Sequence, residues 1–351
     1  MAGNQSLRAA NRAKQDEFYT QLVDIENELK HYREHFRGKT VFCNCDDPRV
    51  SNFFHYFSYN FEQLGLKKLI TTCYKNQERD LFSQHNSERA IWLEYTGDHN
   101  GNRVPDPKEI GINYLQGDGD FRSQECIELL KQADIVVTNP PFSLFREFVT
   151  QLMTYNKDFL ILGNQNALTY RDIFTYIKND KMWLGYKFGD MSFMVPDYFE
   201  PRATRYWEDD NGQKWRSMGN ICWFTNMDIA KRHEDLILYK QYNCEEYPVF
   251  DNYEAINVDK VSDIPNDYLG MMGVPITFLD KYNPSQFEIV DGIGRYSMLT
   301  GPTEETQGKY LTDINGQHKY ARIIIRRRQR PIPYTVDEEN PLPMAAETDN
   351  N

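Results

Sequence analysis

The chain has 351 residues, of which 40% are hydrophobic and 14% aromatic, and its formal net charge is −12. This length accommodates one large α/β domain or a core domain with an appended module, and the acidic balance differs from the usual composition of a nucleic-acid-binding protein. The first residues are polar, and no apolar run reaches the roughly 18 residues of a membrane-spanning helix, so we expect no signal peptide and no contact with a membrane. The six cysteines lack metal-binding spacing and a readable disulfide framework, which favours a reducing cytoplasm.

The first half of the sequence predicts alternating helices and strands. Residues 1–13 are polar and are predicted to be flexible. Apolar residues recur at helical spacing from Phe18 to Phe36, which predicts an amphipathic helix that starts at Lys14 and ends at Gly38. Further helices are expected over 51–65, 123–133, 143–156 and 169–179, and strands over 39–47, 67–74, 89–98, 112–121, 134–142, 158–164, 181–188, 191–199 and 219–226. This alternation predicts an α/β fold with a doubly wound, mostly parallel sheet and an antiparallel edge strand.

From about Ile237 the sequence changes in character. Short aromatic-rich runs, prolines and turn residues replace the helical periodicity, which predicts a smaller module over 237–332. Within it, the stretch from Arg322 to Arg330 is strongly basic, whereas residues 333–351 form an acidic, proline-containing tail that is typical of disorder. The basic stretch predicts either contacts with phosphates or an exposed edge strand that its charges keep soluble.

Three polar clusters follow predicted strands. They are Asn44–Asp47 after the first strand, Asp118–Phe121 after a later one and Asn139–Phe142 after the next. Because ligands in open α/β sheets bind outside the carboxyl ends of the strands, one crevice is expected to collect all three clusters. Each cluster also has a plain structural interpretation. The first can be a helix entry with acidic residues at the helix dipole, and the other two can be ordinary turns.

The sequence Asn139-Pro140-Pro141-Phe142 suits the binding of a planar amine. The prolines stiffen the turn and keep the residue before each of them extended. Neither proline has an N–H group, Asn139 adds a side-chain carbonyl, and Phe142 offers a flat apolar face. Such a rigid pair of acceptors can hold both hydrogens of an aromatic amine and free its lone pair for attack on an electrophilic methyl group. Positioning and electrostatics then supply most of the rate, and neither a metal nor a covalent intermediate is required.

The stretch DIVVTNPPFS resembles motif IV of the amino-group DNA methyltransferases, and residues 41–74 and 274–290 resemble the EcoRI-type adenine-specific DNA methyltransferases. The resemblance covers most of residues 14–330. It implies a Rossmann-like class I methyltransferase core over 14–236, which uses S-adenosylmethionine, and a DNA target-recognition module over 237–332. The implied reaction is methyl transfer to N6 of an adenine flipped out of double-stranded DNA. The implied biological role is host protection or phage DNA modification. The expected partners are DNA and a cognate restriction endonuclease, and the chain is expected to be a monomer.

The resemblance also assigns roles to individual residues. The catalytic motif would be Asn139, Pro140, Pro141 and Phe142, with the carbonyl of Pro140 as the second acceptor and Phe142 stacking on the adenine. Phe193 is a candidate for the opposite stacking face, with a core position as its alternative. The cofactor contacts would come from three segments that resemble motifs X, I and III, namely Phe18, Tyr19, Thr20, Asn44, Cys45, Asp46, Asp47, Asp118, Asp120 and Phe121. Phosphates of the DNA would meet Arg322, Arg326, Arg327 and Arg328.

Two departures from the family pattern concern the cofactor. Motif I usually has glycines where the strand turns into the helix, but Asn44–Asp47 contains none. The second strand ends at Tyr74 rather than at an acidic residue that could bind ribose hydroxyls. The missing glycines leave open a catalytically silent nucleic-acid-binding relative. A further alternative is the same core acting on RNA or on a protein glutamine amide, since these substrates also present a planar NH₂ group.

Overall fold

The computed structural model describes residues 18–45, 51–72, 90–102, 105, 109–197, 199–306 and 308–329. The predicted flexible N-terminus and the predicted acidic tail lie outside these residues. Of the helices in the described ranges, none is long and apolar enough to cross a membrane.

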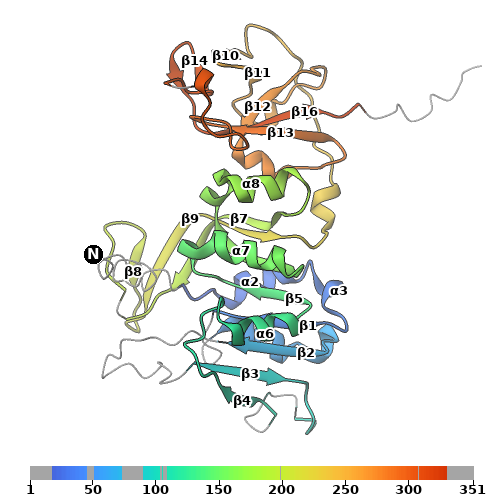
Figure 1. The fold of residues 1–351 in the computed structure, drawn as a ribbon, viewed down its shortest axis with the longest axis vertical. Coiled ribbons are helices and arrows are strands. Elements are labelled where there is room, and N and C mark those ends of the chain that lie inside the picture. The colour runs from blue at the N-terminus through green and yellow to red at the C-terminus, as the bar shows by residue number, and fades with distance from the viewer. Residues whose placement is uncertain are drawn as a thin grey trace, which may run out of the picture.

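A large mixed β-sheet forms the centre of the molecule (Figure 1). Within the described residues its nine strands are β1 (Thr40–Cys43), β2 (Lys68–Thr72), β3 (Ile91–Tyr95), β4 (Gly111–Tyr114), β5 (Ile135–Thr138), β6 (Asp158–Asn164), β7 (Trp183–Met194), β8 (Tyr206–Glu208) and β9 (Lys214–Thr225). The order is β4-β3-β2-β1-β5-β6-β9-β7, with β8 paired to β9, and the neighbours β2, β1, β5 and β6 are parallel.

The sheet has an antiparallel edge as expected, but its antiparallel part is larger than a single strand. Antiparallel strands flank the parallel unit on both sides, with β3 and β4 beyond β2 and with β9 and β7 beyond β6. The reason is local connectivity: β3 and β4 pair with each other as a hairpin insertion, and β7 and β9 are two long strands that pair over most of their length.

Helices cover both faces of this sheet (Figure 1). One face carries α2 (Leu22–Leu29), α3 (Arg33–Phe36), α4 (Asn52–Tyr59) and α5 (Phe61–Leu64), and the other carries α6 (Gln124–Gln132), α7 (Phe145–Thr154) and α8 (Arg171–Lys178). Successive residues of a strand point to opposite faces. Accordingly, Val41 of β1 packs into the core under the first group of helices, and its neighbour Phe42 packs into the core under the second group.

The helix predicted from Lys14 begins later than the sequence suggests. Lys14 lies outside the described residues, and residues 18–20 are extended rather than helical. The backbone N–H of Tyr19 donates to the carbonyl of Met194 at 2.9 Å in an isolated antiparallel bridge. Helix α2 starts only at Leu22. This tertiary pairing overrides the helical periodicity of the segment.

A second sheet follows in the C-terminal part of the chain. Its strands, in sheet order, are β10 (Val249–Phe250), β11 (Tyr253–Asn257), β12 (Met272–Pro275), β16 (Arg322–Arg327) and β13 (Phe287–Ile293), and a separate pair is formed by β14 (Asp313–Ile314) and β15 (Gln317–His318). The sheet lies next to α8 (Figure 1), and a Cβ atom at Gly292 of β13 would lie 3.0 Å from Cζ of Phe174 in α8. One hydrophobic core runs through both sheets.

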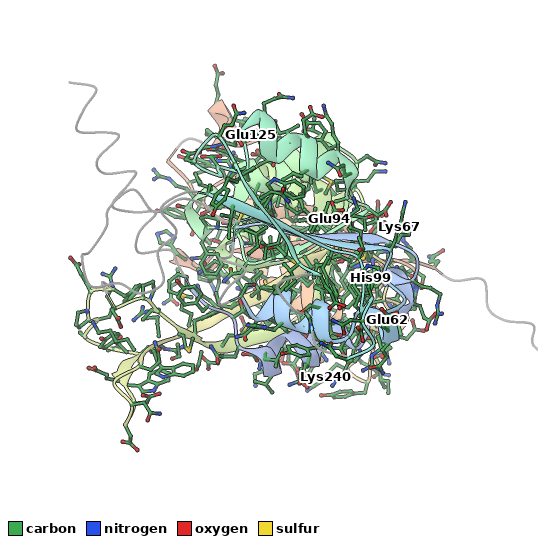
Figure 2. The ribbon with its side chains drawn as sticks, turned by 90° about the horizontal axis from the view of Figure 1, so that it is seen from below. Glu62, Lys67, Glu94, His99, Glu125 and Lys240 are labelled. Atoms are coloured by element: carbon green, nitrogen blue, oxygen red, sulfur yellow. The ribbon has the colours of Figure 1, made fainter. Side chains whose placement is uncertain are left out.

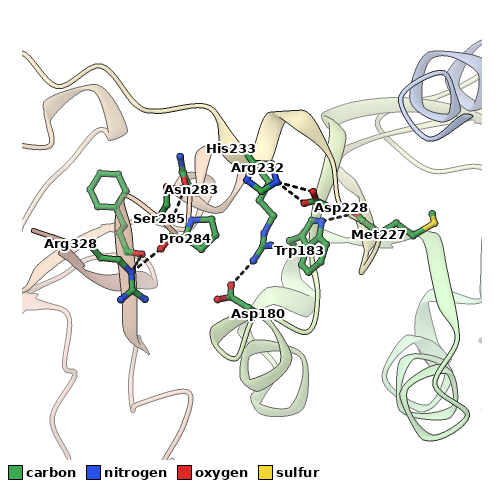
Figure 3. Close-up of polar contacts among 11 residues, drawn as sticks. Asp180, Trp183, Met227, Asp228, Arg232, His233, Asn283, Pro284, Ser285 and Arg328 are labelled. Atoms are coloured by element: carbon green, nitrogen blue, oxygen red, sulfur yellow. Dashed lines mark hydrogen bonds and ion pairs between the residues drawn. The ribbon is translucent and has the colours of Figure 1, made fainter. Parts of the chain in front are cut away.

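The segment between β9 and β10 is fastened to both sheets (Figure 3). On the side of the first sheet, Arg232 lies over the ring of Trp183 at 3.9 Å and donates to Asp180 at 2.6 Å. On the side of the second sheet, the side chain of Asn283 donates to Asp235 at 2.8 Å.

The described residues also contain short 3-10 helices. They are η1 (Phe142–Leu144), η2 (Gln165–Thr169), η3 (Ala230–His233), η4 (Val261–Asp263), η5 (Ile276–Lys281) and η6 (Glu304–Thr306).

Candidate active site

The three polar clusters identified in the sequence follow strands that end at the same edge of the first sheet. Strands β1 and β5 are parallel neighbours. Strand β4 runs in their direction as well, because its pairing with β3 and the pairing of β3 with β2 are both antiparallel. Asn44, Asp118 and Asn139 therefore all lie beyond this carboxyl edge. Asp46 and Asp47 lie outside the described residues.

Asn139 is buried, and its amide group has a fixed orientation. The Nδ2 atom donates to the backbone carbonyl of Phe18 at 2.6 Å. Because a carbonyl oxygen only accepts hydrogen bonds, Nδ2 must face Phe18 and Oδ1 must face away from it. Among the described residues, no donor is bonded to Oδ1. The side chain thus presents an acceptor just after β5.

The two prolines after Asn139 differ in how their carbonyls are used. The carbonyl of Pro141 accepts from the backbone N–H of Leu144 at 2.9 Å, which starts the turn into η1. The buried Pro140 receives no hydrogen bond at its carbonyl from the residues that the structure describes. Within the described residues, Oδ1 of Asn139 and the carbonyl of Pro140 both lack a donor, as the amine-binding hypothesis requires.

Phe142 belongs to an aromatic cluster around Phe18. The rings of Phe142 and Phe18 lie 5.6 Å apart with an interplanar angle of 23°. Phe18 also contacts Phe193 at 5.6 Å and Phe199 at 5.9 Å. Phe142 is half-buried, whereas Phe193 has no exposed surface. The ring of Phe193 is enclosed in the core against Phe18, which favours the core position given as its alternative.

The segment from Phe18 to Thr20, which resembles motif X, runs between the NPPF turn and β7. The carbonyl of Phe18 accepts from Asn139, and the carbonyl of Thr20 accepts from Nδ2 of Asn52 at 2.7 Å. On the opposite side, Tyr19 pairs with Met194 of β7. The structure thus brings this segment against Asn139, although the ring of Phe18 itself packs among aromatic side chains.

Several buried polar atoms near the ends of β1 and β2 have no hydrogen-bond partner in the described part of the chain. They are Oδ1 of Asn44 and the hydroxyls of Thr71 and Thr72, which point to opposite faces of β2. The hydroxyl of Thr20 in the N-terminal segment is unpaired as well. An unpaired buried polar group costs about 1–3 kcal/mol, so these atoms call for a ligand. S-adenosylmethionine fits them, because its ammonium group can donate to the Asn44 oxygen and its ribose hydroxyls can both donate and accept. Sequence reasoning missed Thr71 and Thr72. The available signal was a pair of polar residues at the end of an apolar strand.

Cys45 takes a backbone conformation that glycine normally supplies. Its φ is 77°, in the left-handed region that costs a residue with a Cβ atom about 1–2 kcal/mol. The residue before it is held in place, since the hydroxyl of Thr138 donates to the carbonyl of Asn44 and joins the ends of β5 and β1. The chain therefore makes the turn after β1 without the glycines of the family pattern.

We expect the variant Cys45→Gly to be more stable than Cys45→Ala by about 1 kcal/mol, because only glycine adopts this φ without a steric penalty. Both variants remove the thiol, so their difference isolates the backbone. Urea unfolding followed by circular dichroism measures the two free energies. Equal stability of the two variants would show that Cys45 is not strained.

The third cluster, Asp118–Phe121, mainly contacts other residues of the protein. Asp118 accepts from the backbone N–H of Asp120 at 3.1 Å. Burial opposes ionisation of Asp120, but hydrogen bonds from Arg122 outweigh it and lower the pKa of Asp120. Phe121 is buried with its ring 5.1 Å from that of Phe148. The prediction that Phe121 contacts the cofactor is therefore not supported by its place in the core, and the half-buried Asp118 and Asp120 remain candidates.

Arg322 is not placed to bind phosphate. It is buried in β16, where its Nε donates to Asn257 at 3.1 Å and its guanidinium lies 3.4 Å from Asp259. The alternative of an exposed edge strand is also wrong, because β16 lies between β12 and β13. Three buried isoleucines, Ile323–Ile325, explain this central position, since burial of apolar surface outweighs the flanking charges.

The other three arginines of β16 and its end differ in their environments. Arg326 forms an ion pair with Glu288 at 2.9 Å across β16 and β13. Arg327 is half-buried. The Nε atom of Arg328 donates to the carbonyl of Pro284 at 2.8 Å (Figure 3). Arg322 is therefore the one of the four whose guanidinium is buried, and the contact of Arg326, Arg327 and Arg328 with phosphates stays a prediction.

A rigid pair of acceptors at the carboxyl edge of a mixed α/β sheet, beside unsatisfied polar atoms that fit S-adenosylmethionine, defines a methyltransferase acting on an amino group. The model of the family described as adenine-specific methyltransferase EcoRI matches residues 6–328, and the chain belongs to this family. It is an adenine-specific DNA methyltransferase.

Proteins with similar sequences are named Type II methyltransferases. The chain is 48% identical to the Type II methyltransferase M.EcoRI of Escherichia coli, with 93% of this chain and 98% of that protein covered. It is 43% identical to the Type II methyltransferase M.MgeORF184P of Mycoplasma genitalium (91% and 98% covered) and 38% identical to M.MpnI of Mycoplasma pneumoniae (92% and 98% covered). No solved structure matches the chain.

Proposed function

We propose that the enzyme methylates N6 of an adenine that is flipped out of duplex DNA, with Asn139 and Pro140 as the acceptors for the two hydrogens of the amine. The observation that carries this proposal is the orientation of the Asn139 amide. Its Nδ2 donates to the carbonyl of Phe18 at 2.6 Å, so Oδ1 faces away from Phe18. An acceptor that is already oriented needs no reorganisation when the amine arrives.

The chain's own residues would then divide the work as follows. Oδ1 of Asn139 and the carbonyl of Pro140 orient the amine and reduce the delocalisation of its lone pair. After transfer the nitrogen carries a positive charge and releases one proton to solvent, because neither neutral carbonyl can retain it. Phe142, which is half-buried, stacks on the flipped base. When bound, S-adenosylmethionine supplies an electrophilic methyl group. Asn44, Thr20, Thr71 and Thr72 would hold it through their unpaired atoms.

We further propose a class I, Rossmann-like core over residues 14–236 and a target-recognition module over 237–332. The support is the separate second sheet, which lies beyond α8 and carries none of the three clusters at the carboxyl edge. A role in host protection beside a cognate endonuclease is proposed by analogy with the Type II relatives. A monomeric state and a cytoplasmic location stay predictions.

The decisive experiment offers DNA, RNA and a protein lysate together to the enzyme with methyl-labelled S-adenosylmethionine. We expect the label in DNA, as N6-methyladenine by mass spectrometry. Label in RNA or in glutamine would overturn the proposed substrate. A catalytically silent relative is tested separately by calorimetry, because such a protein would not bind S-adenosylmethionine with or without DNA. Methylome sequencing of a plasmid that carries the gene then reports the target site.

A further inference from the structure

The extended segment Phe18–Thr20 lies between β7 and two asparagine side chains. On one edge of the segment, the backbone N–H of Tyr19 donates to the carbonyl of Met194 in β7 at 2.9 Å. In an extended chain the N–H and C=O groups of one residue point to the same edge, and those of its neighbours point to the other edge. The carbonyls of Phe18 and Thr20 therefore face away from β7.

Each of these two carbonyls accepts a hydrogen bond from a side-chain amide. Nδ2 of Asn139 donates to the carbonyl of Phe18 at 2.6 Å, and Nδ2 of Asn52 donates to the carbonyl of Thr20 at 2.7 Å. The two amides bind the same edge of the segment, where the N–H groups of a neighbouring strand would lie in a regular sheet. The position of the Phe18 carbonyl, which orients Asn139, therefore depends on Asn52 as well.

Asn52 is the first residue of α4, and the start of this helix is firmly held. Ser51 caps the helix, because its side chain accepts from the backbone N–H groups of Phe53 and Phe54. Phe53 is only 1% exposed, and its ring lies 6.1 Å from that of Trp223 in β9. Since Ser51 supplies the cap, the amide of Asn52 is available to bind the segment from a fixed position.

Helix α4 and the segment lie on the same face of the first sheet. In Figure 2, Glu62 of α5 and Glu125 of α6 lie on opposite sides of Glu94 in β3, so the two layers of helices are seen separately. Phe18 and Phe53 both belong to the hydrophobic core on the side of α4 and α5. Asn52 therefore reaches the segment from within its own layer.

We propose that Asn52 is a positioning residue for methyl transfer. Through the carbonyl of Thr20 it holds the segment in place, so that the carbonyl of Phe18 keeps the amide of Asn139 turned toward the amine. Without this anchor the segment shifts and the orientation of Asn139 is no longer fixed before the base arrives, which costs rate. This inference rests on the proposed function and deepens it, because it extends the support of the acceptor to a residue of α4.

The first test measures kcat of Asn52→Ala at saturating S-adenosylmethionine and DNA. We expect kcat to fall about tenfold, the order of one hydrogen bond that positions a reacting group. Saturation matters because the hydroxyl of Thr20 is itself a proposed cofactor contact, and a change there would appear in the cofactor affinity. Asn60→Ala is the matched control and should leave kcat unchanged, since Nδ2 of Asn60 donates to the carbonyl of Tyr56 at 2.8 Å at the other end of α4.

A double-mutant cycle with Asn139→Ala separates positioning from a general structural role. In the Asn139→Ala background, Asn52→Ala should cause no further loss in the single-turnover rate of labelled methyl transfer, because the amide that it helps to orient is absent. A general structural role would lower the rate by the same factor in both backgrounds. An unchanged kcat of Asn52→Ala, or equal losses in the two backgrounds, would overturn the inference.

A second variant guards against a failure of Asn52→Ala to fold, which circular dichroism would reveal. Asn52→Asp keeps the size of the side chain, and a carboxylate in the first turn of α4 is favoured by the helix dipole. It places an oxygen against the carbonyl of Thr20, so it should lose at least as much kcat while it stays folded, and full activity would contradict the inference. Failure of the proposed function looks different, because the unmodified enzyme would then leave no N6-methyladenine in DNA.

Discussion

Asn139→Ala is expected to lower kcat for methyl transfer by about 10²–10³-fold, the usual effect of removing one preorganised hydrogen-bonding group from an active site. Alanine removes the acceptor Oδ1 and also the hydrogen bond from Nδ2 to the carbonyl of Phe18. Calorimetry with S-adenosylmethionine and a kinetic assay with DNA separate the two losses. Undiminished activity of this variant would contradict the proposed mechanism.

A second substitution at Asn139 separates the role of Oδ1 as an acceptor from the role of the hydrogen bond between Nδ2 and Phe18, which orients the amide. Asn139→Asp keeps an acceptor oxygen, but it places a carboxylate oxygen against the Phe18 carbonyl, where Nδ2 now donates at 2.6 Å. If orientation by Phe18 matters, this variant should lose activity although it retains an acceptor. Asn27→Ala serves as the control, because Asn27 is exposed on α2 and, among the residues that the structure describes, bonds only to Lys30 at 3.4 Å.

Glu28→Ala is expected to lower the free energy of unfolding by about 3–5 kcal/mol, because it leaves several buried donors without an acceptor. Glu28 lies in α2 with no exposed surface. Its carboxylate accepts from the hydroxyl of Tyr32 at 3.0 Å and from the backbone N–H groups of Tyr186 at 2.7 Å and Lys187 at 2.8 Å. Burial raises the pKa of Glu28, and these backbone hydrogen bonds oppose the shift.

This buried carboxylate joins the N-terminal helix to β7. Urea unfolding of Glu28→Ala measures the stability, and Glu26→Ala, an exposed neighbour on the same helix, is the control. A loss below 1 kcal/mol would show that water satisfies the exposed donors and that the contact is structurally minor.

The sequence predicted much of the first sheet because its signals are local. The apolar strands β1, β2, β5 and β6 and the helices between them follow from periodicity and from caps such as Ser51, whose side chain accepts from the backbone N–H groups of Phe53 and Phe54. The NPPF turn was found for the same reason, since two prolines in sequence constrain the backbone wherever they stand.

The features that could not be predicted depend on long-range contacts. The extended conformation of residues 18–20 comes from the pairing of Tyr19 with Met194, which is distant in sequence. The engagement of Arg322 with Asn257 is likewise set by a partner that no local pattern reveals.

The left-handed turn at Cys45 also bears on how relatives of this enzyme are found. A glycine in a sequence motif often marks a position where the backbone has a positive φ angle, but other residues can also adopt such an angle. In this chain Cys45 does so. A search that demands glycines after the first strand would discard this chain, although its backbone turns at the same point. Profiles for such enzymes are better anchored on the NPPF turn, where the chemistry itself dictates the residues.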